Sequence, residues 1–156
     1  MDPLRQPTET ESKWYYYGLP SRPKLVARSS FTPYVLPMEG RLPEPKTQTV
    51  VGEHDIVAKW NNDPSMLQEQ IFNILTQHDV QWQAIDILRI GYSNQEEIPV
   101  ILSISVSRGT LSWQAGDRVA RQCRSALLDH KLDVHCEIRE STVTFIGWGA
   151  FEGVRF

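Results

Sequence analysis

Each of the four histidines in this 156-residue chain has an acidic residue beside it, an arrangement that could serve general acid–base catalysis. The four settings are Glu53-His54-Asp55, His78-Asp79, Asp129-His130 and His135-Cys136-Glu137. Adjacent residues on a strand point to opposite faces, and adjacent residues on a helix do not face each other. Neighbours in sequence therefore form no catalytic dyad. We expect no catalytic residue in the chain and no enzymatic activity of its own.

A zinc site is the second chemistry that the residue types suggest, through Cys123, His130, His135 and Cys136. Their spacing fits no standard zinc finger, and on a strand Cys136 would point inward while His135 points outward. A buried cysteine usually behaves as a small apolar residue. We therefore expect both cysteines in the core, no bound metal and no cofactor, since the chain also has no glycine-rich phosphate-binding motif.

Aromatic residues and cations gather in the segment KWYYYGLPSRPKLVARSS, residues 13–30. Its four adjacent aromatic residues are a candidate surface for docking this segment or a partner: Trp14, Tyr15, Tyr16 and Tyr17. A second candidate binding surface is a basic patch on a predicted helix, where arginines occur every three residues: Arg118, Arg121 and Arg124. Aromatic and basic residues together can bind nucleic acid. The formal charge is −3, with nine Lys/Arg against fourteen Asp/Glu in residues 51–156, which argues against a broad phosphate-binding surface.

Prolines indicate where a compact domain begins, because eight of the ten lie within the first 45 residues. Each removes a backbone donor and restricts the residue before it. We predict that residues 1–12 are disordered and that 13–46 form an extended, proline-rich arm with partial polyproline II character. An α+β domain then spans 47–147, and 148–156 form a short tail. The aromatic residues of such an arm cannot form a core alone, so we expect them to anchor it to the domain.

Hydrophobic periodicity predicts the elements of this domain. A short strand at 47–52 precedes a helix that begins with Asp63 as N-cap and Pro64, buries Leu67, Ile71, Ile74 and Leu75, and ends near His78. Strands at 82–92 and 99–107 form a hairpin whose serines, Ser103, Ser105 and Ser107, face solvent. Ser112 caps a helix over 113–130, and a strand follows at 133–141 that 142–147 either extends or follows with a further strand.

These elements predict a two-layer α+β sandwich, with an antiparallel sheet of three or four strands and two helices on one face. If the strand at 47–52 forms, a ferredoxin-like split βαβ arrangement is an alternative within this class. The N-terminus lacks the apolar region of a secretory signal, and no apolar run approaches the roughly 20 residues of a membrane-spanning helix. We therefore expect a cytoplasmic or nuclear protein that does not act at a membrane.

Five stretches within residues 14–141 carry a resemblance of pattern to a protein group: WYYYGLPSRPKLVARSS, VGEHDIVAKWN, AIDILRIGY, PVILSISVSRGTLSW and VHCEIRES. They resemble the N-terminal region of uncharacterised filamentous-fungal proteins, many of which continue into a segment similar to a trypsin-like serine protease. No nucleophile motif of the Gly-Asp-Ser-Gly type occurs here, and Ser141 is followed by TVTFIGWG. The resemblance thus implies a non-catalytic accessory domain that regulates or docks a neighbouring domain.

Our leading hypothesis is a non-catalytic interaction or regulatory domain with a protein partner or a neighbouring domain. One alternative is a nucleic-acid-binding module that uses the aromatic and basic arm together with the arginine patch. A second is a fragment of a serine-protease-like protein that lacks the catalytic part. A third is an enzyme that uses His130, His135 and Cys136 in a cleft at the end of the 113–130 helix.

Overall fold

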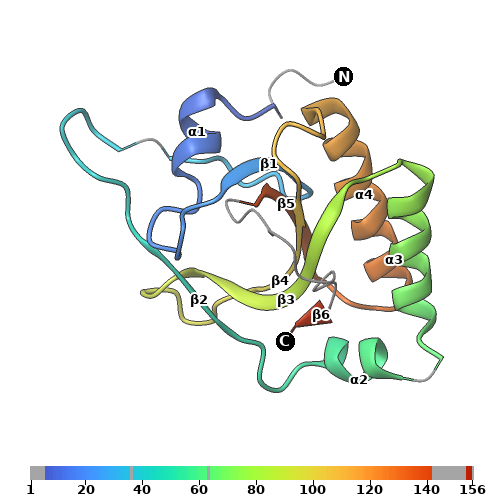
Figure 1. Cartoon of the computed structure of the whole chain (residues 1–156). Helices are drawn as coiled ribbons and strands as arrows, with labels where there is room; N and C mark the ends of the chain where they lie inside the picture. The colour runs from blue at the N-terminus through green and yellow to red at the C-terminus, as the bar shows by residue number, and fades with distance from the viewer. Residues whose placement is uncertain (1–5, 36, 63, 142–153, 156) are drawn as a thin grey trace.

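The computed structural model describes residues 6–35, 37–62, 64–141 and 154–155 of the chain. Its elements follow the order α1 Glu9–Trp14, β1 Lys24–Arg28, β2 Lys46–Val50, α2 Asp55–Asn61, α3 Met66–Gln77, β3 Trp82–Tyr92, β4 Val100–Val106, α4 Trp113–Asp129, β5 His135–Glu140 and β6 Val154–Arg155. They form an α+β fold around one sheet, which confirms the predicted class (Figure 1).

The sheet is mixed, with the strand order β1-β5-β4-β3-β2, and β6 pairs with β3 beside this path. The predicted hairpin is confirmed, since β3 and β4 pair antiparallel from Trp82 opposite Val106 to Arg89 opposite Val100. The prediction of an antiparallel sheet is wrong because α4 carries the chain back, so that β5 runs parallel to β4. These two strands are direct neighbours, whereas a split βαβ unit has another strand between them. The order therefore does not match the ferredoxin-like alternative.

One face of the sheet carries the main core, beneath α3 and α4 (Figure 1). Leu67, Ile71 and Leu75 of α3 are buried as predicted, while Ile74 is only partly buried. On α4 the predicted stripe is buried from Gly116 to Leu127, and Ser112 caps the helix by accepting a hydrogen bond from the backbone N–H of Ala115. These stripes meet the alternate residues of β3, β4 and β5 that face the helices, such as Ile85, Leu102 and Ile138.

The opposite face of the sheet is also buried, so the prediction of a solvated serine face is wrong. Ser103 is fully buried, and Ser105 is 8% exposed. A second apolar cluster lies on this face and joins the N-terminal segment to β3 and β4: Tyr15, Tyr16, Leu19, Leu25, Ile90 and Ile101. Alternation along β4 indicated one polar face, but it carries no information about a distant segment that covers that face.

Residues 6–35 and 37–46 do not form the predicted disordered N-terminus and extended arm. Residues 9–14 form a helix, because the Thr8 side chain caps it by accepting a hydrogen bond from the backbone N–H of Glu11 at 3.0 Å. Residues 24–28 form β1, which pairs with β5 at one end of the sheet. Pro20, Pro23 and Pro33 lie outside this strand. Their lack of a backbone N–H therefore removes no hydrogen bond between β1 and β5.

The region before α3 also differs from its prediction. α2 was not predicted, although its Ile56 and Trp60, spaced i and i+4, are both fully buried. The α3 helix begins at Met66 with Ser65 as its N-cap, two residues after the predicted cap, and Asp63 itself lies outside the described residues. The predicted extension over 142–147 also lies outside the described residues, as does the predicted tail apart from the short strand β6.

Candidate functional site

The four adjacent aromatic residues of the N-terminal segment differ in burial, as two are buried and two are half-buried. Tyr15 and Tyr16 are buried against the sheet, and both donate hydrogen bonds to the Glu137 carboxylate, at 3.0 and 2.8 Å. Burial, and then the negative charge of Glu137, raise the pKa of both phenols well above their usual range. A hydrogen-bonded carboxylate under two tyrosines thus ties β5 to a segment about 120 residues earlier.

Lys46, the first residue of β2, completes this buried cluster. Its Nζ lies 3.3 Å from the centroid of the Tyr15 ring and 5.5 Å from that of Tyr92, which are cation–π arrangements. Burial lowers the pKa of Lys46 to about 8, against the opposing effect of Glu137. The side chain is 7% exposed, so this cluster stabilises the fold and is not open to a substrate.

Trp14 and Tyr17 are half-buried and contact each other. Their ring centroids lie 5.7 Å apart, and the Arg22 guanidinium lies 4.3 Å from the centroid of Trp14. The structure thus divides the candidate docking surface into an inner tyrosine pair and an outer pair that remains accessible.

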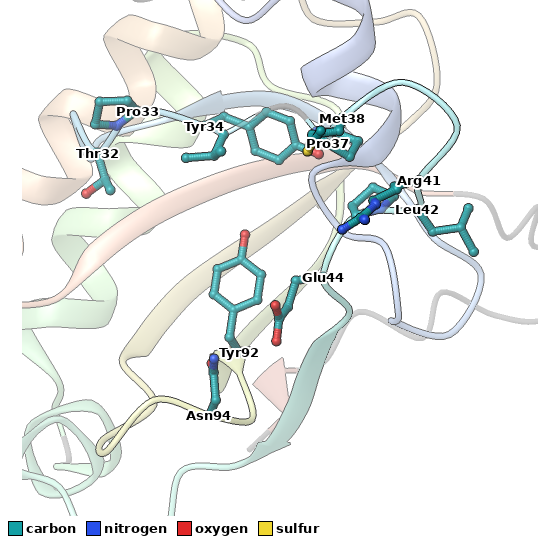
Figure 2. A pocket seen from close by; sticks show the side chains of 12 residues that line it. Thr32, Pro33, Tyr34, Pro37, Met38, Arg41, Leu42, Glu44, Tyr92 and Asn94 are labelled. Atoms are coloured by element: carbon teal, nitrogen blue, oxygen red, sulfur yellow. The ribbon is translucent and has the colours of Figure 1, made fainter.

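A cavity of about 560 Å³ lies between the proline-rich segment 31–44 and the end of β3 (Figure 2). From the segment come Pro33, Tyr34, Pro37, Met38 and Leu42, among others; from β3 and the turn after it come Tyr92 and Asn94. Figure 2 shows Tyr92 rising from the strand toward the segment that carries Tyr34. Tyr34 is itself held by the inner cluster, since its ring centroid lies 6.0 Å from that of Tyr15. The cavity is therefore built on the same anchor that fixes the N-terminal segment.

Four large apolar side chains of the 31–44 segment are exposed to solvent, and three of them, Val35, Met38 and Leu42, line this cavity. Phe31, Val35, Met38 and Leu42 are 70%, 82%, 71% and 67% exposed. Single exposed apolar residues are ordinary, but four within twelve residues, three of them lining an apolar cavity, are typical of an interaction surface. We call this set, together with the cavity, the proline-loop surface.

Two tyrosine hydroxyls provide polar groups at this surface. Burial raises the pKa of Tyr34 and of Tyr92, so both hydroxyls are neutral hydrogen-bond donors around neutral pH. The hydroxyl of Tyr34 is occluded and has no hydrogen-bond partner among the residues that the structure describes. An occluded hydroxyl without a partner costs about 1–3 kcal/mol.

Two of the three arginines of the patch on α4 are paired with acidic residues. Arg121 is paired with Asp117 at 3.1 Å, and Arg124 with Asp133 at 2.8 Å. Arg124 also donates to the backbone carbonyl of Val134, which fastens the end of α4 to the chain entering β5. Arg118 is exposed.

The four histidines each form a hydrogen bond in a different part of the fold, and the two cysteines are buried. His54 caps α2, and His78 and His130 bond to Gln122 and Gln70. His135 Nδ1 lies 2.8 Å from the hydroxyl of Ser29, while burial lowers the pKa of His135. Both cysteines are buried and reduced.

No group of three or more His, Cys, Asp or Glu residues is placed to hold a metal ion in the part of the chain that the structure describes. Within the same part, no helix is both long enough and apolar enough to cross a membrane.

Comparison with known proteins gives no match: no family model, no curated protein and no solved structure is similar to this chain.

The proline-loop surface was missed in the sequence. Its signal was present in PYVLPMEGRLP, residues 33–43, where large apolar residues alternate with prolines that exclude a regular helix. Tyr92 could not have been assigned to it, because the sequence does not show that residue 34 lies near the end of a strand almost 60 residues later.

Proposed function

We propose that this chain is a non-catalytic protein-interaction module, and that the proline-loop surface binds its partner. The observation that carries the proposal is the set of four exposed apolar side chains in one segment, three of which line an apolar cavity. The free energy of the system falls when a partner covers a surface of this kind and removes it from water. The resemblance of the sequence pattern to an accessory region agrees with such a role.

The occupant that fits this surface best is an extended, proline-containing apolar segment of a protein partner. Tyrosines and prolines line the cavity, and side chains that can donate hydrogen bonds to peptide carbonyls also line it: Thr32, Arg41, Tyr92 and Asn94. Polyproline II ligands dock in aromatic-lined grooves in this way, since their carbonyls are free and their backbone loses little entropy on binding. Arg41 and Glu44 at the rim carry opposite charges, so the lining favours neither an acidic nor a basic ligand.

A capped nonapeptide of three Pro-Pro-Leu repeats, titrated calorimetrically into the whole chain, tests this proposal. The double variant Met38→Ser/Leu42→Ser removes two exposed apolar side chains of the surface. We expect it to weaken binding by about tenfold or more, since each buried side chain of this size contributes about 1.5 kcal/mol or more.

The double variant Met66→Ser/Leu128→Ser is the matched control, because it changes the same residue types at exposed positions on α3 and α4. It should bind the peptide as the unchanged chain does. Equal weakening by both variants, or equally tight binding of an Ala-Ala-Leu repeat, would contradict the proposal. Self-association that only Met38→Ser/Leu42→Ser abolishes would replace the peptide by a second copy of the chain.

A further inference from the structure

A second cavity, of about 470 Å³, lies at the end of the sheet where β4 and β5 finish. Its lining includes four cations from separate parts of the chain: Lys13 at the end of α1, Arg22 and Lys24 around the start of β1, and Arg108 in the turn after β4. Val106 pairs with Glu140, and Glu140 with Lys24, so strand pairing brings Arg108 to the N-terminal cations. This site and the proline-loop surface lie at opposite ends of β4, so neither proposal depends on the other.

None of these four cations forms an ion pair with any residue that the structure describes. Glu140 also lines the cavity, and its carboxylate accepts a hydrogen bond from the backbone N–H of Gly109 at 2.8 Å. Four positive charges against one carboxylate leave a strongly positive cavity in a chain whose formal charge is −3.

Arg22 is held in place before any ligand arrives. Its guanidinium stacks 4.3 Å from the centroid of the Trp14 ring, while Lys13 Nζ lies 5.6 Å from the same centroid. Ser21 and Arg22 both have positive φ, 62° and 34°, a backbone conformation that is rare for residues other than glycine. A stacked guanidinium keeps the N–H donors at its edge free, so Arg22 can still form paired hydrogen bonds with an anion. Strain held in this way is typical of functional positions.

We propose that this cavity binds a phosphate monoester on a phosphorylated side chain of a protein partner. Such a phosphate carries close to two negative charges at neutral pH and accepts several hydrogen bonds, which suits a cavity lined by four cations. All four cations are exposed, so the cavity is open to solvent and accessible to a charged group that projects from a larger molecule. A phosphorylated side chain of a protein is such a group.

A nucleic-acid backbone fits this site less well. Its phosphodiesters carry one charge each and are spread along the strand, so proteins bind them with a line of cations. Here the cations converge on one cavity, and on α4 two arginines of the basic patch are already paired with acids.

Nuclear magnetic resonance titration of the whole chain tests the proposal, with a capped pentapeptide that contains one phosphoserine among alanines as the probe. We expect saturating shifts of the Gly109 and Lys24 amide signals, and no such shifts with the same peptide carrying serine. The double variant Arg22→Gln/Arg108→Gln should weaken the binding by about tenfold or more, because each arginine supplies charge-assisted hydrogen bonds.

The matched control is Arg118→Gln/Arg121→Gln, which removes the same two charges from α4 and should leave the affinity for the phosphopeptide unchanged. Equal weakening by both double variants would show a nonspecific charge effect and overturn the proposal. Absence of saturating shifts at low salt would also overturn it. Saturation of the same signals by decathymidylate at lower concentrations than by the phosphopeptide would assign the site to nucleic acid instead.

Discussion

Glu137 is the residue on which the N-terminal segment and the sheet depend most directly. Its carboxylate is buried, and a buried carboxylate is costly unless it is paired and hydrogen-bonded. Tyr15 and Tyr16 provide two hydroxyl donors, and Lys46 provides a positive charge nearby. The two tyrosines that could have served as a stacking platform for a ligand are thus occupied inside the protein, which leaves Trp14 and Tyr17 for any outside contact.

Removing one hydroxyl from this cluster measures how much the cluster stabilises the fold. Tyr16→Phe deletes the 2.8 Å hydrogen bond while it keeps the buried ring. We expect the free energy of unfolding to fall by about 1–3 kcal/mol, because a buried charged acceptor loses a donor. Urea denaturation followed by far-ultraviolet circular dichroism provides the measurement.

Tyr17→Phe is the control for this change, since Tyr17 is half-buried and neighbours Tyr16 in sequence. Its unfolding free energy should stay within about 0.5 kcal/mol of that of the unchanged chain. Equal losses in the two variants would mean that the Glu137 cluster contributes nothing specific.

At the scale of the elements, local pattern predicted those elements whose own residues decide their form. The stripe of α4, its Ser112 cap and the β3–β4 hairpin depend on residues close together in sequence, and all three are present. The capping pair Thr8 and Glu11 was an equally local signal for α1, but the surrounding prolines and polar residues outweighed it. The pairing of Tyr16 with Glu137 was beyond such reasoning, because no periodicity links residues 121 positions apart.

Gly18 determines how closely the N-terminal segment approaches β2. The carbonyl of Tyr17 accepts a hydrogen bond from the backbone N–H of Lys46 at 2.7 Å, and a Cβ on Gly18 would lie 2.6 Å from the Lys46 carbonyl oxygen. Gly18 also has φ of 101°, where a side chain is strained. We expect Gly18→Ala to cost more than about 3 kcal/mol of unfolding free energy, because strain and a backbone collision add.

Gly52→Ala separates these two contributions. Gly52 also has positive φ, 69°, but a Cβ there would meet nothing within 4 Å. Its alanine variant should lose only the conformational part, about 1–2 kcal/mol, in the same thermal or urea unfolding experiment. If Gly18→Ala were no more destabilising than Gly52→Ala, the close approach of the segment to β2 would be wrong.

At the scale of the whole molecule, the sheet is enclosed on both faces by different parts of the chain. α3 and α4 cover one face, and the N-terminal segment covers part of the other, with the ionisable cluster of Glu137 and Lys46 beneath it. Stability should therefore depend on pH through the groups that this second layer buries. Lys46, Tyr15 and Tyr16 titrate above neutral pH, and so does Cys136 on the helix face, whose pKa is raised by its contact with Cys123 and by burial.

The contribution of Lys46 can be isolated, because its sign is opposite to that of the others. Between its folded pKa of about 8 and its ordinary value of 10.5, the unfolded chain binds more protons than the folded one, so stability rises with pH. Cys136, Tyr15 and Tyr16 have raised pKa values in the folded chain. Once these groups ionise in the unfolded chain, the folded chain binds more protons than the unfolded one, so stability falls as pH rises. This fall begins at about pH 9 for Cys136 and at about pH 10 for the two tyrosines. The unchanged chain should gain stability from pH 8 to 9, level off and then lose it.

Lys46→Met removes the rising contribution and leaves the falling ones. Its unfolding free energy relative to the unchanged chain should therefore drop by about 1–2 kcal/mol between pH 8 and pH 10, since one pH unit across a titrating site amounts to about 1.4 kcal/mol. A constant difference for Lys46→Met would mean that this lysine is not buried against Tyr15 in solution, and that the N-terminal segment does not close over the sheet as the structure describes.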